Sequence, residues 1–166
     1  LEILMDTPFE EVRALAMDNG DLFAGANNDL ASHLQSGKLE KREGFLVTDA
    51  GQTPKCAVIR IGKDRVPQTV WQSSNSQVYA LEAWKGRLLV GTGNRSRIFA
   101  IPLDPKQRDM DPFEALTEVG AGQATAFLPS GSEMLVAASN PAELHALSEV
   151  QATEGTLDSP VLPAQP

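Results

Sequence analysis

Residues 77–101, QVYALEAWKGRLLVGTGNRSRIFAI, carry the strongest structural signal in this chain of 166 residues. Apolar and polar side chains alternate in the first and last parts of the stretch, and β-branched or aromatic residues recur there. This pattern is typical of half-buried strands. The dipeptide Lys85-Gly86 separates the first two parts as a tight turn would. The stretch therefore predicts three strands joined by short turns.

The same pattern occurs once before and once after this stretch. Residues 11–26, EVRALAMDNGDLFAGA, align without a gap with residues 77–92 at a shift of 66 positions. A shift of 46 positions places Gln77 on Gln123 and Val90 on Val136, and it places RIFAI on ELHAL. Only the turn glycine is displaced, since Gly131 falls one residue away from the position of Gly86. The chain therefore contains three copies of one unit.

Each unit is predicted to contain four strands in the same order. An outer strand comes first (EILM, QTVWQ or EALTEV), a strand with small side chains follows, and two further strands come after a turn. Residues 1–5 would begin the first unit, and the other two would begin near Gln68 and Glu114. Four strands in 40 to 50 residues are typical of the blades of a β-propeller.

The predicted fold is therefore all-β, a partial β-propeller of about three four-stranded antiparallel blades. A β-sandwich is the alternative, because many short antiparallel strands would serve it equally well. Propellers close with about four to eight blades. Three blades leave exposed edges, so we expect the chain to lie within a larger protein or complex.

Several residues have predicted structural roles because they recur at equivalent positions of the units. Asn19-Gly20 predicts a type I′ hairpin turn, in which both central residues need positive φ. Truncation of Leu81 to alanine should lower the free energy of unfolding by about 2–5 kcal/mol. The residues expected to be buried are Leu15, Leu22, Val78, Leu81, Leu88, Val90, Phe127 and Val136.

The predicted domain organisation is a propeller region over residues 1–150, followed by a proline-rich segment over residues 151–166. That segment is either a linker or the start of a following domain, because its prolines make it a poor helix and a poor central strand. An insertion over residues 27–55 lengthens the first unit. It is either a decorative loop or a loop that contacts a partner.

The stretch at 77–101, with TVWQSSNS before it, resembles the WD40-like or quinoprotein-like β-propeller repeats of large bacterial surface and periplasmic proteins. The resemblance covers most of residues 1–147 and identifies blades without indicating a chemistry. The WD dipeptides of true WD40 repeats are absent. The ending EGTLDSPVLPAQP is similar to the segment that leads from some such propellers toward a β-sandwich domain. The resemblance implies an extracytoplasmic location, either periplasmic or secreted.

Composition argues against several classes of function. The net charge of −8 disfavours nucleic acid as a partner, because phosphate binding needs a basic field. The single cysteine, Cys56, rules out an intrachain disulfide and is expected to be buried. His33 and His145 have no second metal ligand at a useful spacing. No apolar run is long enough for a membrane helix.

No catalytic pattern is visible, so we predict no enzyme activity, no catalytic residues, no metal site and no cofactor. The predicted function is a non-catalytic scaffold that mediates protein–protein interaction, with a protein partner or the remainder of a longer chain. The alternative is an extracytoplasmic carbohydrate-binding or enzymatic propeller whose site needs blades absent from this chain. Trp71 and Trp84 either pack between blades or stack on a partner or sugar. The candidate partner-binding residues are Asn94, Arg95, Arg97, Trp71 and Trp84.

Overall fold

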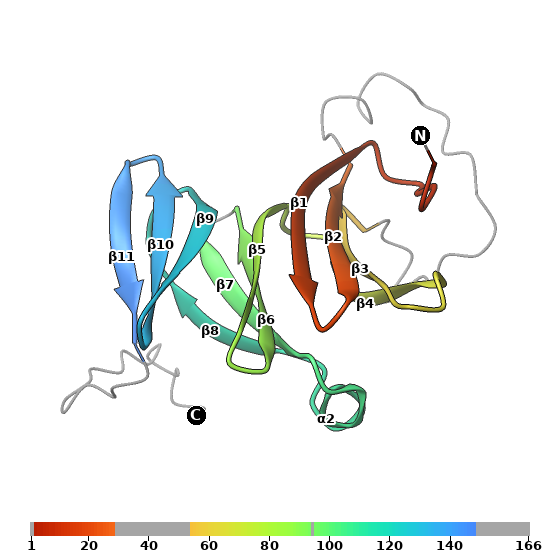
Figure 1. Cartoon of the computed structure of the whole chain (residues 1–166). Coiled ribbons are helices and arrows are strands. Elements are labelled where there is room, and N and C mark those ends of the chain that lie inside the picture. The colour runs from red at the N-terminus through yellow and green to blue at the C-terminus, as the bar shows by residue number, and fades with distance from the viewer. Residues whose placement is uncertain (1, 29–53, 94, 149–166) are drawn as a thin grey trace, which may run out of the picture.

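The computed structural model describes residues 2–28, 54–93 and 95–148, and Figure 1 shows three β-sheets side by side. The insertion predicted at 27–55 lies mostly outside the described residues, as do the C-terminal segment and Asn94. The strands of the first sheet are β1 (Glu11–Asp18), β2 (Asp21–Asn27), β3 (Cys56–Ile61) and β4 (Pro67–Ser73). Those of the second sheet are β5 (Val78–Trp84), β6 (Arg87–Thr92), β7 (Arg97–Pro102) and β8 (Glu114–Glu118). Those of the third sheet are β9 (Gln123–Ser130), β10 (Glu133–Ser139) and β11 (Glu143–Leu147).

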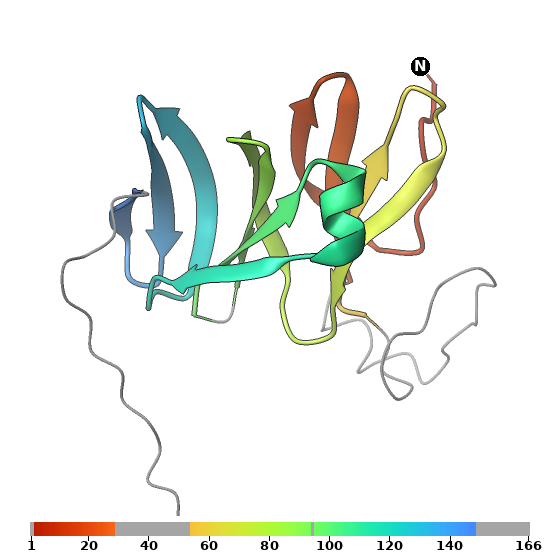
Figure 2. The same ribbon diagram turned by 90° about the horizontal axis from the view of Figure 1, so that it is seen from below.

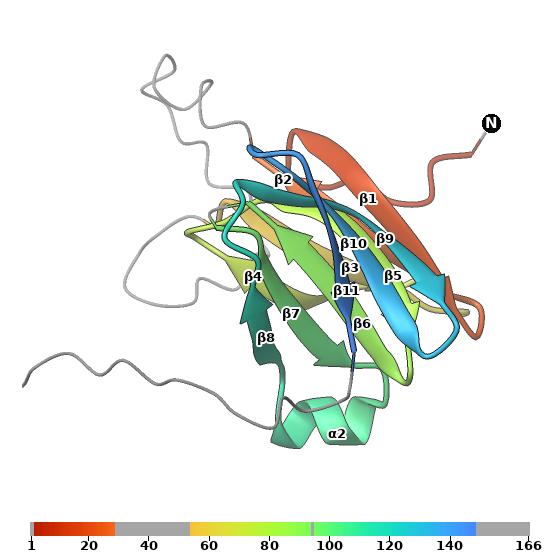
Figure 3. The ribbon, with the colours of Figure 1, turned by 90° about the vertical axis from the view of Figure 1, so that its left-hand side faces the viewer.

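The predicted all-β class is confirmed for the described residues, which form antiparallel sheets of four, four and three strands. Neighbouring strands in each sheet follow one another along the chain. The first strands of the sheets lie in a row, because β5 contacts β1 on one side and β9 on the other; Figure 2 shows the row of sheets from below. A short helix, α2 (Pro105–Met110), lies in the connection between β7 and β8 (Figure 3).

The prediction that an outer strand begins each unit is wrong, because these strands pair with the sheet that precedes them in the chain. Strand β4 pairs with β3 and completes the first sheet, and β8 pairs with β7 and completes the second. The five-residue link at 62–66 lets β3 and β4 form a local hairpin, whereas the chain after β4 crosses to the next sheet. The strand expected at residues 1–5 is also wrong for its described part, because residues 2–7 belong to no strand.

The turns and bulges confirm that the units are equivalent in three dimensions. Asn19 and Gly20 both have positive φ, as a type I′ turn requires, and so do Lys85 and Gly86. Gly131 takes positive φ at the position of Lys85, so the displaced glycine still serves the same turn. The pairing of the first two strands also shifts at equivalent residues in the first two sheets, between Val12 and Ala14 and between Val78 and Ala80.

The first core lies between the first and second sheets. Phe23, Val58 and Trp71 of the first sheet meet apolar side chains of the second. The Asn27 side chain, fully buried, joins the two sheets through hydrogen bonds with the main chain of Val78: it donates to the carbonyl and accepts from the N–H, each at 2.8 Å. The residues that the second sheet contributes to this core are Val78, Leu81, Leu88, Val90 and Ile101.

The second core lies between the second and third sheets, and it uses the opposite face of β6 and β7. Leu89, Ile98 and Ala100 point to this side, while their neighbours point to the first core. Their partners in the third sheet are Ala124, Met134 and Val136. The second sheet is therefore covered on both faces, which explains why β6 and β7 are apolar at almost every position.

Five of the eight residues predicted to be buried are buried: Val78, Leu81, Leu88, Val90 and Val136. Leu22 and Phe127 are half-buried, and Phe127 packs against the second core. The prediction for Leu15 is wrong, since its side chain is 62% exposed. Leu15 corresponds to Leu81, which faces the preceding sheet; among the described residues no sheet precedes β1.

Cys56 is fully buried at the start of β3, as predicted. Burial raises the pKa of its thiol to about 12, because the thiolate would lose its hydration inside the protein. The thiol is therefore protonated and unreactive at neutral pH.

Candidate functional site

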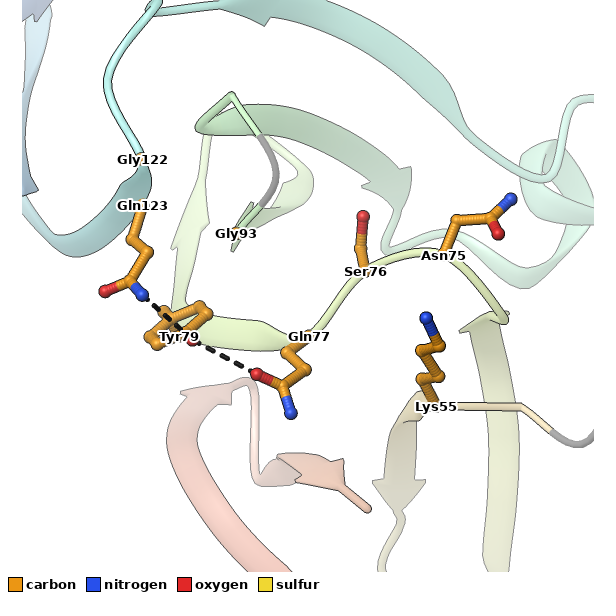
Figure 4. Close-up of a pocket in the computed structure, with 8 residues that line it drawn as sticks. All are labelled: Lys55, Asn75, Ser76, Gln77, Tyr79, Gly93, Gly122 and Gln123. Atoms are coloured by element: carbon orange, nitrogen blue, oxygen red, sulfur yellow. Dashed lines mark hydrogen bonds between the residues drawn. The ribbon is translucent and has the colours of Figure 1, made fainter. Parts of the chain in front are cut away.

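A small polar pocket lies at one end of the sheets, where the β4–β5 connection meets the start of β9 (Figure 4). Its volume is about 180 Å³. Tyr79 of β5 lies between Gln77 and Gln123 (Figure 4). The residues that line it are Lys55, Asn75, Ser76, Gln77, Tyr79, Gly93, Gly122 and Gln123.

A chain of hydrogen bonds runs through this pocket and links all three sheets. The Tyr79 hydroxyl donates to Gln77 Oε1 and accepts from Gln123 Nε2, each at 3.1 Å. Gln77 Nε2 donates to the carbonyl of Asn28, and Ser139 donates to Gln123 Oε1. These polar groups line the pocket and also form hydrogen bonds with one another. The hydrogen bonds hold the ends of the sheets in place.

Replacement of Tyr79 by phenylalanine is expected to lower the free energy of unfolding by about 1 kcal/mol, because both glutamines lose a partner at a partly buried position. Urea unfolding of the parent and the variant measures this change. A double-mutant cycle with Gln123→Ala should show a coupling of about 0.5 kcal/mol or more. Independent effects of the two changes would contradict the proposed hydrogen-bond chain.

The candidate partner-binding residues Arg95 and Arg97 do not line this pocket. Asn94 is outside the described residues. Arg95 and Arg97 are exposed, and both form ion pairs with Glu118 of β8, at 3.9 Å in the case of Arg95. The two arginines therefore lie on the surface beside the outer strand of the second sheet.

The two candidate tryptophans occupy different environments. Trp71 is 6% exposed, and its ring lies 5.1 Å from that of Phe99 and 6.5 Å from that of Phe113. This placement favours the packing role over partner contact for Trp71. Trp84 is half-buried against the second core, and the ammonium group of Lys85 lies 4.3 Å from the centre of its ring.

Parts of the two end faces of the sheet stack expose apolar side chains, although Ala26, Ala57 and Ile59 of the first sheet are buried against Phe9 and Met5. On the first sheet, Leu15 is 62% and Met17 is 68% exposed. On the third sheet, Leu128 is 62% and Leu144 is 70% exposed. Pairing places Leu128 beside Leu135 and Leu144 beside Ala137, so an apolar patch extends across the third sheet.

The described residues contain no group of three or more His, Cys, Asp or Glu side chains close enough to hold a metal ion. No helix in the same part of the chain is long and apolar enough to cross a membrane.

No protein-family model matches this chain, and no curated protein matches it. Among solved structures, the chain is similar to the crystal structure of the computationally designed Ika4 protein. The two sequences are 15% identical, and the match covers 89% of this chain and 98% of that one, with a TM-score of 0.38.

Proposed function

We propose that this chain is a partial β-propeller of about three blades that acts as a non-catalytic scaffold. It holds protein partners, or further parts of a longer polypeptide, against the ends of its sheet stack. The proposal is supported by the sequence repeat of 46 residues and by the packing of consecutive sheets face to face through their apolar sides. We also propose an extracytoplasmic location, because the repeats resemble those of bacterial surface and periplasmic β-propeller proteins.

The exposed apolar faces at both ends of the stack are the main support for this function. Leu15 corresponds to Leu81 and Leu144 corresponds to Ile98, and both counterparts are buried between sheets. Leu15 and Leu144 are therefore apolar, like residues that pack between two sheets, but no neighbouring sheet covers them among the described residues. Contacts with a partner would remove this apolar surface from water, at roughly 25 cal/mol per Å² of buried area.

A photoreactive amino acid placed at residue 15 or residue 144 tests the scaffold in the cells that produce the protein. We expect covalent adducts to protein at both positions. The control position is Met110, which is 80% exposed on helix α2 and outside both end faces. The scaffold is contradicted if residues 15 and 144 give no more adduct than residue 110. The mass of each adduct distinguishes a second copy from a different protein.

A further inference from the structure

In the part of the chain that the structure describes, the third sheet has three strands, whereas the other two sheets have four. In the first and second sheets, the outer edges of β3 and β7 are paired by β4 and β8. Among the described residues, no strand pairs with the corresponding edge of β11. An open edge presents main-chain donors and acceptors that can accept another strand.

Residues 2–7, EILMDT, align in the repeat with β4, the strand that completes the first sheet. The shift of 66 positions that aligns β1 with β5 also places Leu4 on Val70 of β4. This segment forms no strand in the structure, and Ile3 and Leu4 are 83% and 52% exposed. Met5 packs against a buried cluster that contains Phe9 and Ala26, so the segment would leave this place in order to pair with another sheet. Among the described residues, an outer-strand sequence thus pairs with no strand, and the edge of β11 also pairs with no strand.

The two features lie at opposite ends of the sheet stack. Figure 1 places the N-terminus beside the first sheet and β11 at the far side of the third, and Figure 2 shows the same separation from below. The second sheet and its two packed cores lie between them. A single copy in this arrangement cannot bring residues 2–7 to β11.

We propose that residues 2–7 of a second copy pair with β11, so that the first sheet of that copy packs on the third sheet of its neighbour. This rests on the proposed scaffold function and names its partner. The register follows from the repeat, because Cys56 lies opposite Ser73 and Arg97 lies opposite Glu118. At the equivalent position of β11, Glu143 then lies opposite Thr7 of the second copy.

The surfaces that this pairing brings together are complementary in chemistry. The exposed Leu15 and Met17 of one copy face the exposed Leu128 and Leu144 of the other. A groove of about 240 Å³ also lies between β8 and β11, lined in part by His145. It lies next to the open edge, where side chains of an added strand can enter it.

The contact between copies is expected to be looser than the packing within one chain. Gly25 lies against Val78, and Gly91 lies against Ala124, so each internal junction has a glycine at the closest approach. At the junction between copies, the equivalent pair is Ala137 and Val12. The methyl group of Ala137 keeps the sheets farther apart. We therefore expect reversible association that depends on concentration.

Sedimentation of the full chain over a range of concentrations tests the association. We expect the average mass to rise from one copy toward two or more. Leu144→Asp should weaken association at least tenfold, because it places a charge in the apolar contact while its side chain is exposed in a single copy. Met110→Asp, on helix α2, should leave association unchanged. A monomer at all concentrations overturns the proposal.

A cysteine pair tests the strand pairing itself. The variant Thr7→Cys/Glu143→Cys should form a disulfide between copies under mild oxidation, while native Cys56 stays unreactive in the core. The control Thr7→Cys/Arg97→Cys should not, since β8 already pairs with β7. Equal cross-linking in both variants, or none in either, overturns the pairing. If the chain is monomeric but residue 144 captures a different protein in cells, the scaffold function stands and the second copy as its partner does not.

Discussion

Replacement of Leu81 by alanine is expected to lower the free energy of unfolding by about 2–5 kcal/mol. The side chain is 6% exposed and lies in the core between the first and second sheets. Truncation removes buried apolar contacts and leaves a cavity that the flanking strands cannot fill, since both are held by hydrogen-bond ladders. Urea unfolding of the parent and the variant measures the difference.

Leu15→Ala is the matched control for this prediction, because the two leucines occupy equivalent positions of the repeat. Leu15 is 62% exposed, so its truncation should change the free energy of unfolding by no more than about 0.5 kcal/mol in dilute solution. Equal losses in the two variants would show that a neighbour covers Leu15. If Leu81→Ala left the free energy of unfolding unchanged, Leu81 would not be packed between the first and second sheets.

Replacement of Gly25 by alanine is expected to lower the free energy of unfolding by about 1–3 kcal/mol through overpacking. A Cβ atom at this position would lie 2.5 Å from Cγ1 of Val78 and 3.4 Å from Cβ of Ala14. Val78 is fully buried and its main chain is held by Asn27, so it has little room to move. The new methyl group therefore pushes the second sheet away from the first. Thermal and urea unfolding both report this loss.

Shortening the opposing side chain checks the cause. In the double variant Gly25→Ala/Val78→Ala, the new methyl group no longer meets Cγ1, so the total loss should be smaller than the sum of the two single losses. Additive losses would indicate that the effect of Gly25→Ala comes from the local backbone and not from the contact between sheets.

Sequence reasoning found the strands, the turns and the equivalence of the units, because these follow from local chemistry. Alternating side chains and Asn19-Gly20 report on residues close in the chain. Helix α2 was not predicted, although Asp104 caps its N-terminus by accepting from the N–H of Lys106 and Pro105 opens it. An Asp-Pro pair before a polar run was a usable signal for this helix.

The polar pocket was partly visible in the sequence. Gln77 and Gln123 recur at the same position of two units, and both bond to Tyr79. What the sequence could not indicate is that a tyrosine of β5 would stand between them. That arrangement depends on how the second and third sheets meet, which is a property of their packing.

The sequence by itself determined that the chain forms repeated antiparallel strands with apolar faces, since propensity, alternation and turn chemistry act within a few residues. Only the tertiary structure decided which of these faces are covered. Leu81 and Leu15 have the same place in the repeat, yet one is buried and the other is exposed. Burial depends on a neighbouring sheet, and a repeat pattern is the same whether that neighbour is present or not.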